Sequence, residues 1–259
     1  NYYIGNNLIL IIRMIKKNIP NFFTSLNFLC GCLASYFAFK SLFEAAFLLV
    51  LIGAFFDLFD GFFARLLKVE SNFGLQFDSM ADLVTSGLVP GIVMYKLFLQ
   101  VGIKELDFVF NFINVDFIFS FSPLAIIGFM IPLSSAIRLT RFNLDFTQKD
   151  EFNGLPAPAN ALFIVSLPIL FDHSAFNSIK PFVFSFPSLL IITILSSILM
   201  NLRFKLFSFK LNSFKVNENL YQITFFLVGV VLFYFLNWIS IPILIISYII
   251  INIFRNYLK

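Results

Sequence analysis

Four aspartates stand in or at the ends of two segments that otherwise consist of lipid-soluble residues: Asp57, Asp60, Asp78 and Asp82. A carboxylate at membrane depth is costly, so its presence there indicates a functional site. Side chains three or four positions apart share one face of a helix, so each pair would project together. The two segments would run antiparallel across a short connection. We therefore expect all four carboxylates to meet near one surface of the membrane.

Charge repulsion limits what such a group can do. Four unpaired carboxylates at close range would repel one another strongly, and one or two divalent cations would remove that penalty. Oxygen ligands without His or Cys favour hard ions such as Mg²⁺, Mn²⁺ or Ca²⁺ over Zn²⁺. Two ions about 4 Å apart would hold a phosphoryl group between its attacking and leaving oxygens. The pattern thus favours a two-metal phosphoryl-transfer site.

Small and basic residues beside the acids support this interpretation. Gly61 and Ala64 lie on nearly the same helical stripe and would let a bulky ligand approach the helix backbone. Arg65 carries a planar donor fork suited to phosphate oxygens. Two alternatives stay open on these residues alone. The acids could pair with Arg65, Arg138 and Arg141 in a buried ion network. They could also form the site of a cation transporter, although an ion pathway has no need of the G-x2-A-R insert between them.

Composition sets the class of protein. The chain has 259 residues, of which 59% are hydrophobic and 12% are charged. A soluble domain carries about a quarter charged residues. These values predict an all-α polytopic membrane protein whose surroundings are the lipid bilayer, and they give no indication of nucleic-acid binding.

Apolar runs predict the number of spans. A spanning helix needs about 20 mostly apolar residues. Eight segments approach that length: 20–39, 42–66, 74–99, 116–141, 156–171, 182–200, 220–237 and 239–255. Residues 8–19 predict a short N-terminal amphipathic helix on the membrane surface. No long hydrophilic stretch separates two halves, so we expect one membrane domain over residues 1–259. It would hold a motif core at 19–172 and C-terminal spans at 182–255.

Basic residues predict the orientation. With these eight spans, all 18 Lys and Arg fall on one side of the membrane except Lys40, Lys96, Lys104 and Lys180. Positive charge concentrates on the cytoplasmic side of membrane proteins. The chain is therefore expected in a bacterial cytoplasmic membrane, with both termini and the mouth of the acidic site facing the cytoplasm.

The acidic stretch from Asp57 to Asp82 reads D-x2-D-G-x2-A-R-x8-G-x3-D-x3-D. It resembles the signature of the CDP-alcohol phosphatidyltransferase family at every fixed position and spacing. The resemblance implies a reaction in which an alcohol displaces CMP from a CDP-linked lipid within the membrane. It also implies that Asp57, Asp60, Asp78 and Asp82 bind two divalent ions, Mg²⁺ or Mn²⁺, in a homodimer. In this family pattern Asp82 would serve as the general base.

The same resemblance suggests where the CDP group would bind. The residues expected there lie on the first three spans, and they are Asn21, Thr24, Gly61, Ala64, Arg65 and Gly74. Asn21 and Thr24 would hydrogen-bond the cytidine, and the small residues would let the nucleotide approach the backbone. A helix cap at Asn21 and a bond from Thr24 to its own helix are the open alternatives.

Three further runs resemble one branch of the family, the membrane-integral phosphatidylserine synthases. They read I-P-N-F-F-T-S-L-N-F-L-C-G at 19–31, R-L-T-R-F-N at 138–143 and F-N-G-L-P-A-P-A at 152–159. Thr140 departs from the Ala expected in the second run. This branch implies CDP-diacylglycerol as donor and serine as acceptor, with Arg138, Arg141 and Asn143 binding the acceptor.

Two alternatives remain around the acceptor. Arg138 and Arg141 could instead be ordinary topological charges. A sister enzyme would use glycerol 3-phosphate or inositol phosphate, although a phosphorylated acceptor should demand more cations than this chain offers around the site.

Overall fold

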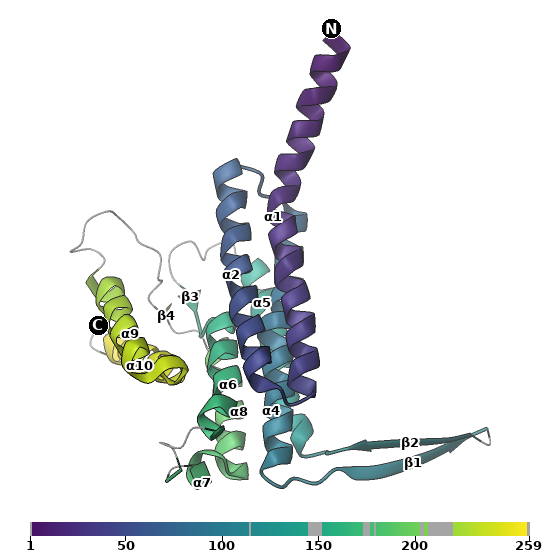
Figure 1. Ribbon diagram of the computed structural model, residues 1–259, viewed down its shortest axis with the longest axis vertical. Coiled ribbons are helices and arrows are strands. Elements are labelled where there is room, and N and C mark those ends of the chain that lie inside the picture. Colours follow the sequence, from purple (N-terminus) through teal and green to yellow (C-terminus); the bar gives the residue numbers. More distant parts are fainter. Residues whose placement is uncertain are drawn as a thin grey trace.

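Long apolar helices packed side by side form the body of the protein in the computed structural model (Figure 1). The structure describes residues 2–113, 115–144, 152–172, 177–178, 180–202, 205–206 and 220–257, in places as backbone only. The bundle consists of α1 (Tyr2–Phe39), α2 (Phe43–Leu67), α3 (Asn72–Asp82), the π-helical turn η1 (Leu83–Leu88), α4 (Val89–Gln100), the 3-10 turn η2 (Ala125–Phe129), α5 (Met130–Leu144), α6 (Ala157–Asp172) and α8 (Phe186–Asn201). A β-hairpin leaves the end of the bundle opposite the N-terminus (Figure 1).

Smaller elements complete the chain. They are β1 (Leu106–Phe112), β2 (Val115–Phe121), β3 (Phe152–Asn153), α7 (Lys180–Val183), β4 (Lys205–Leu206), α9 (Leu220–Leu236), η5 (Asn237–Ile239) and α10 (Ser240–Tyr257). β1 pairs antiparallel with β2, and β3 with β4. The core lies where α2, α4, α6 and α8 meet, and it contains the fully buried Val50, Phe98, Ile164 and Leu189.

Five helical segments in the described part of the chain are long and apolar enough to cross a membrane, and the last of them runs from α9 through η5 into α10. They are Lys16–Phe39, Phe43–Leu67, Asn72–Gln100, Ala125–Leu144 and Leu227–Asn252, with shorter apolar helices at Ala157–Leu170 and Phe186–Asn201. The predicted all-α polytopic membrane class is therefore confirmed, whereas the number of eight crossings stays a prediction. Several Lys and Arg that indicate the orientation, such as Lys149 and Arg203, lie outside the described residues.

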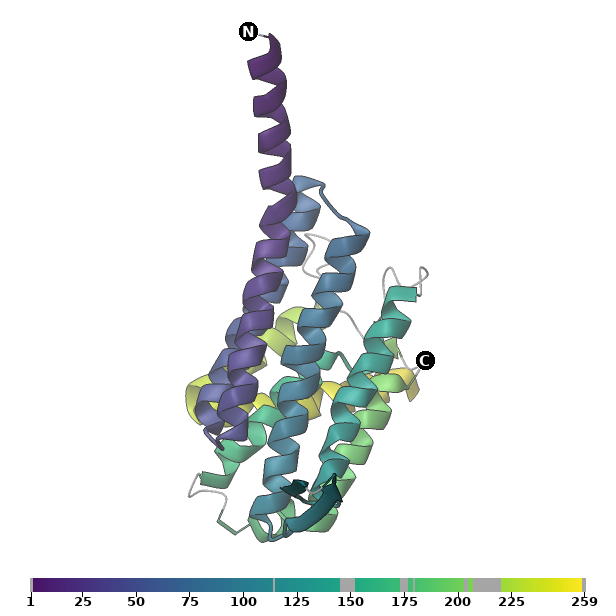
Figure 2. The same cartoon turned by 90° about the vertical axis from the view of Figure 1, so that its right-hand side faces the viewer.

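The C-terminal helices depart from the rest of the bundle. The predicted break between two helices near residue 237 is confirmed, because Asn237 adopts a left-handed φ of 49° between α9 and α10. Both helices are strongly tilted against the long axis of the bundle (Figures 1 and 2). Trp238 packs its ring edge against Phe47 of α2 and Phe233 of α9, at centroid distances of 5.6 and 5.3 Å. These contacts attach the C-terminal pair to the core.

Two predicted boundaries were wrong. The fourth span was expected to begin at residue 116, but residues 115–121 form β2 and the helical segment begins at Ala125. Val115, Phe117, Phe119 and Phe121 occupy every second position there, with Asp116 and Ser120 between them, and this period of two favours a strand. The predicted surface helix at 8–19 is helical but not separate. It forms one continuous helix with the first span, through Pro20.

A tight turn sets α2 against α3. Lys68 adopts a left-handed conformation with a φ of 54°, and its N–H closes α2 on the carbonyls of Ala64 and Arg65. Ser71 then starts α3, because its Oγ accepts a hydrogen bond from the N–H of Gly74 at 3.1 Å. The aspartates near the end of α2 and within α3 are thereby brought face to face.

Two glycines let α1, α2 and η1 approach closely beneath these aspartates. A Cβ added at Gly31 would lie 2.4 Å from Oγ1 and 2.9 Å from the backbone N of Thr85. A Cβ at Gly53 would lie 2.9 Å from Cγ2 of Thr85 and 3.0 Å from Oδ1 of Asn27. Thr85 therefore fits between α1 and α2 because neither Gly31 nor Gly53 has a side chain at this contact.

We expect Gly31→Ala to lower the melting temperature in detergent, because the added methyl must displace the η1 backbone rather than a flexible side chain. Overpacking of this kind costs about 1–3 kcal/mol. Gly229→Ala in α9 is the matched control, since its Cβ would meet Leu244 at an ordinary 3.5 Å. Equal melting temperatures for the two variants would contradict the close packing around Thr85.

Candidate metal centre and pocket

Three of the four aspartates converge on one point. Asp57 and Asp60 on α2 and Asp78 on α3 each offer a carboxylate oxygen, and these oxygens all lie within 4.8 Å of one another. The carboxylates of Asp57 and Asp78 approach to hydrogen-bonding range. Asp60 is 6% exposed, and the other two are half-buried. The antiparallel arrangement expected from the spacing thus brings both helices' acids together.

The contacts of this acidic group fit a hard divalent cation. Thr24 on α1 donates a hydrogen bond to Asp60 Oδ2 at 2.6 Å and lies 3.2 Å from the carbonyl of Pro20, one turn earlier in its own helix. The Oδ1 atom of Asp78 is buried without a hydrogen-bond partner among the described residues. A buried, unpartnered carboxylate oxygen beside two further carboxylates is the donor set that Mg²⁺ or Mn²⁺ prefers.

Asp82 stands apart from this group and has its own partners. Its Oδ1 accepts a hydrogen bond from Nδ2 of Asn27 at 3.3 Å, and Oδ1 of Asn27 accepts one from Oγ1 of Thr85 at 2.8 Å. Asn27 is fully buried. The guanidinium of Arg138 lies within electrostatic range of the Asp82 carboxylate. Asp82 is therefore held by an amide, and its carboxylate lies within electrostatic range of Asp57, Asp60 and Asp78 as well as of Arg138.

Asn27 and Thr85 were missed by sequence reasoning. Both are single polar residues on helical faces already marked by a predicted site residue. Asn27 comes three residues after Thr24, and Thr85 three after Asp82. A spacing of three residues places each of them on the same helical face as a predicted site residue, and this pattern could have identified both. Thr85 also lies in η1, and π-helical turns inside longer helices are frequent at functional sites.

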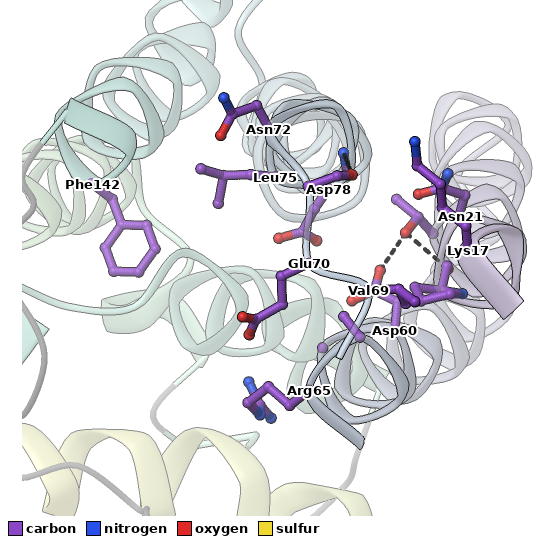
Figure 3. Close-up of a pocket in the computed structure, with 16 residues that line it drawn as sticks. Lys17, Asn21, Asp60, Arg65, Val69, Glu70, Asn72, Leu75, Asp78 and Phe142 are labelled. Carbon is purple, nitrogen blue, oxygen red and sulfur yellow. Dashed lines mark hydrogen bonds between the residues drawn. The ribbon is translucent and has the colours of Figure 1, made fainter. Parts of the chain in front are cut away.

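A pocket of about 460 Å³ opens beside the carboxylates (Figure 3). All six residues predicted to bind the CDP group line it: Asn21, Thr24, Gly61, Ala64, Arg65 and Gly74. Asp60 and Asp78 enter it from α2 and α3, so the acids form part of its wall. Asn21 lies inside α1 rather than at its start, which excludes the alternative of a helix cap.

Further lining residues were not predicted from the sequence. Lys17 enters from α1, Glu70 from the α2–α3 turn, Asn72 from the start of α3, and Phe142 from α5 (Figure 3). Lys17 and Arg65 place two cationic side chains on a pocket that contains two aspartates. The wall therefore carries charges of both signs, which suits a ligand that is anionic and also binds metal ions.

None of the three residues predicted to bind the acceptor lines the pocket beside the carboxylates. Arg138 faces Asp82, and its Nε is buried without a hydrogen-bond partner in the described part of the chain. Arg141 is exposed, and its Nη1 donates to Oδ1 of Asn201 on α8 at 3.5 Å. Asn143 donates from Nδ2 to Oγ of Ser79 on α3 at 2.9 Å. Arg138 lies within range of Asp82, whereas Arg141 and Asn143 hydrogen-bond neighbouring helices, and Oδ1 of Asn143 is buried without a partner among the described residues.

The run at 152–159 has a structural role in the described residues. Gly154 adopts a φ of +79°, and a Cβ there would lie 2.6 Å from the carbonyl of Met200 and 2.8 Å from that of Leu202. The N–H of Leu155 donates to the carbonyl of Leu199 at 2.9 Å. The glycine is needed because the turn before α6 packs directly on the end of α8.

Fold and site together define a helical membrane protein with an acidic centre in the wall of a polar pocket. A profile of the CDP-alcohol phosphatidyltransferase family matches residues 17–254. The chain therefore belongs to that family.

Curated relatives share part of the chain. It is 31% identical over 156 residues to a CDP-diacylglycerol–serine O-phosphatidyltransferase of Helicobacter pylori, covering 60% of this chain and 58% of the relative. A protein of the same name from Bacillus subtilis is 30% identical over 154 residues, covering 60% of this chain and 77% of the relative. An archaetidylserine synthase of Methanothermobacter thermautotrophicus is 29% identical over 150 residues, covering 57% and 56%. The chain thus spans less than two thirds of the length of two of these three relatives.

We expect Mn²⁺ to raise the melting temperature of the protein and Asp60→Asn to remove this response, because the variant loses a metal ligand. Ligand at a hundredfold excess over its dissociation constant stabilises by about 2.7 kcal/mol. Without metal, Asp60→Asn should melt at or above the wild-type temperature, since one of three mutually repelling charges is gone. Glu44→Gln, at the far end of the same helix, is the control and should keep the metal response. An undiminished response in both Asp60→Asn and Asp78→Asn would contradict the site.

Proposed function

We propose that this protein transfers the phosphatidyl group from CDP-diacylglycerol to the hydroxyl of serine, giving phosphatidylserine and CMP. The observation that carries the proposal is the wall of the pocket. Three convergent carboxylates and all six residues expected for the CDP group belong to one site. The names of relatives from Helicobacter pylori and Bacillus subtilis support serine as the acceptor.

The donor would lie with its pyrophosphate at the acids and its nucleotide in the pocket. Asp57, Asp60 and Asp78 would bind Mg²⁺ or Mn²⁺, with two ions expected, and the bound metal would neutralise charge on the pyrophosphate and polarise its phosphoryl oxygens. Arg65 would add a donor fork on the same pocket wall. Gly61, Ala64 and Gly74 keep the helix surfaces low where the nucleotide approaches. The diacylglycerol chains would extend into the surrounding bilayer.

The acceptor would enter on the side of Asp82 and Arg138. The serine hydroxyl attacks the lipid-side phosphorus, the bond from that phosphorus to the CMP oxygen breaks, and the hydroxyl proton passes to Asp82. Arg138 would bind the serine carboxylate, because its buried Nε has no partner among the described residues. Asn27 would act as a positioning residue that fixes the orientation of Asp82 through its amide.

The proposal also covers where the protein lies in the cell and how it assembles. We propose that the protein forms one domain in the cytoplasmic membrane with its pocket open to the cytoplasm, where serine is supplied. A homodimer is expected as in the family. The distribution of basic residues supports the orientation. Family membership supports the homodimer.

We expect purified protein with CDP-diacylglycerol, serine and Mn²⁺ to release CMP, and Asp82→Asn to reduce the rate at least about a hundredfold, because general base catalysis contributes roughly 10²–10⁴. The measurement is CMP release in detergent. Glu44→Gln should retain the wild-type rate. Full CMP release by a folded Asp82→Asn variant would eliminate Asp82 as the base.

A panel of acceptors tests the choice of serine. Serine should support CMP release well above glycerol 3-phosphate and inositol phosphate in the same assay. A preference for a phosphorylated acceptor would assign the chain to a sister reaction. CDP-diacylglycerol that stays intact with every acceptor, under conditions where the protein moves cations across vesicles, would favour the transporter instead.

We expect Asn27→Ala to lower kcat by roughly 10- to 100-fold, since misplacing a reacting group by about 1 Å costs that much. The KM for CDP-diacylglycerol and the Mn²⁺-induced rise in melting temperature should stay unchanged, because the side-chain hydrogen bonds of Asn27 go to Asp82 and Thr85. Thr85 keeps a second acceptor in this variant, the Asn27 carbonyl at 3.1 Å. Ser25→Ala on the same helix is the control. A loss of metal response in Asn27→Ala would show a general structural role instead.

A further inference from the structure

The hairpin of β1 and β2 is amphipathic across its two faces. Cross-strand partners on one face are all apolar: Leu106 with Phe121, Phe108 with Phe119, Phe110 with Phe117, and Phe112 with Val115. The other face pairs Asp107 with Ser120 and Asn111 with Asp116, with one apolar pair, Val109 and Ile118, between them. Both polar pairs are hydrogen-bonded. The sequence therefore builds a phenyl-rich surface on one side of a two-stranded sheet and a mostly polar surface on the other.

The phenyl-rich face is not covered by the part of the chain that the structure describes. Phe110 is 59% exposed, Phe112 56% and Phe117 51%. Neighbouring rings on this face stack on one another, such as Phe108 on Phe121 at 4.6 Å. Exposed apolar surface of this extent on one element marks an interaction site.

The position of the hairpin indicates what meets that face. It connects α4, which ends at Gln100, with η2, which begins at Ala125, and both belong to helices long enough to span the membrane. Its strands run sideways from the bundle, across the direction of the long helices (Figure 1). A sheet that leaves the ends of two spans in this direction would run along the membrane surface rather than through the bilayer.

We propose that this hairpin is an interfacial membrane anchor, with its phenyl-rich face in the boundary between headgroups and acyl chains on the side of the bilayer away from the aspartates. Amphipathic elements bind this layer through their apolar face. The two strands also limit how deep the hairpin can go. Their outer edges carry unpaired N–H and C=O groups, which hydrocarbon cannot satisfy but water and headgroups can.

One side chain fixes the hairpin to the bundle. Oη of Tyr95 on α4 donates to Oε1 of Glu105 at 3.1 Å, just before β1, and accepts from the N–H of Ser122 at 3.4 Å, just after β2. The Tyr95 ring also stacks on Phe129 of η2 at 5.7 Å. Both ends of the hairpin are thus held at α4. This helix is continuous through η1 with α3, which ends at Asp82. The anchor would set the depth of that helix in the bilayer, independently of which reaction the acids catalyse.

Tryptophan fluorescence in vesicles tests the anchor. In a Trp238→Phe background, which removes the single native tryptophan, Phe117→Trp reports the phenyl-rich face and Ile118→Trp the opposite face of the same strand. The protein is reconstituted in phosphatidylcholine vesicles whose acyl chains carry bromine. We expect bromine to quench Phe117→Trp at least twofold more than Ile118→Trp, and aqueous iodide to show the reverse order. Phe110→Trp and Val109→Trp, the cross-strand partners, repeat the comparison if the first pair fails to fold.

The remaining outcomes each overturn the proposal. Equal quenching of both positions by iodide would place the hairpin in water. Shielding of Phe117→Trp from both bromine and iodide would mean that protein, such as a second copy of this chain, covers the face. Strong bromine quenching at both positions would mean that the hairpin is immersed rather than interfacial.

Discussion

Mutual repulsion of buried carboxylates is the constraint on which the rest of the structure depends. The acidic group formed by Asp57, Asp60 and Asp78 brings its oxygens within 4.8 Å of one another inside a membrane protein. Two unit charges at that separation repel by about 3 kcal/mol at an effective dielectric constant near 20. Folding places them there because α2, the tight turn and α3 leave no other arrangement. The compensation has to come from protons or from a cation, and the family to which the chain belongs handles a pyrophosphate that needs one.

Close helix packing supplies the second half of the site. Gly31 and Gly53 let α1 and α2 close around Thr85, and this contact carries Asn27 to Asp82. The arrangement gives one aspartate different partners from the other three. Three aspartates cluster at the pocket, whereas the fourth is held by an amide and faces Arg138. An added methyl group at Gly31 would therefore act first on Thr85, and through Thr85 on Asn27.

The sequence predicted whatever depends on local spacing. Helical periodicity predicted which acids share a face of a helix. The short connection between Arg65 and Gly74 predicted that the two faces meet. The sequence did not reveal contacts between residues far apart in the chain. Hydropathy also did not separate the helical period of 3.6 residues from the strand period of two. Asn27 finds its partners 55 and 58 residues away, which spacing along one helix does not reveal. Residues 106–121 are as hydrophobic as a span, so hydropathy alone assigned half of the hairpin to a helix. The acceptor roles of Arg141 and Asn143 stay predictions, and in the structure their side chains hydrogen-bond Asn201 on α8 and Ser79 on α3.

The most direct test of the account is a crystal structure of the protein with Mn²⁺ and a CDP-linked lipid, with the metal located by anomalous scattering. We expect the anomalous density to be bounded by Asp57, Asp60 and Asp78, and the cytidine to lie in the pocket lined by Asn21, Gly61 and Gly74. Anomalous density away from these three carboxylates, or a nucleotide bound outside this pocket, would contradict the central claim that the gathered aspartates form the metal-dependent donor site.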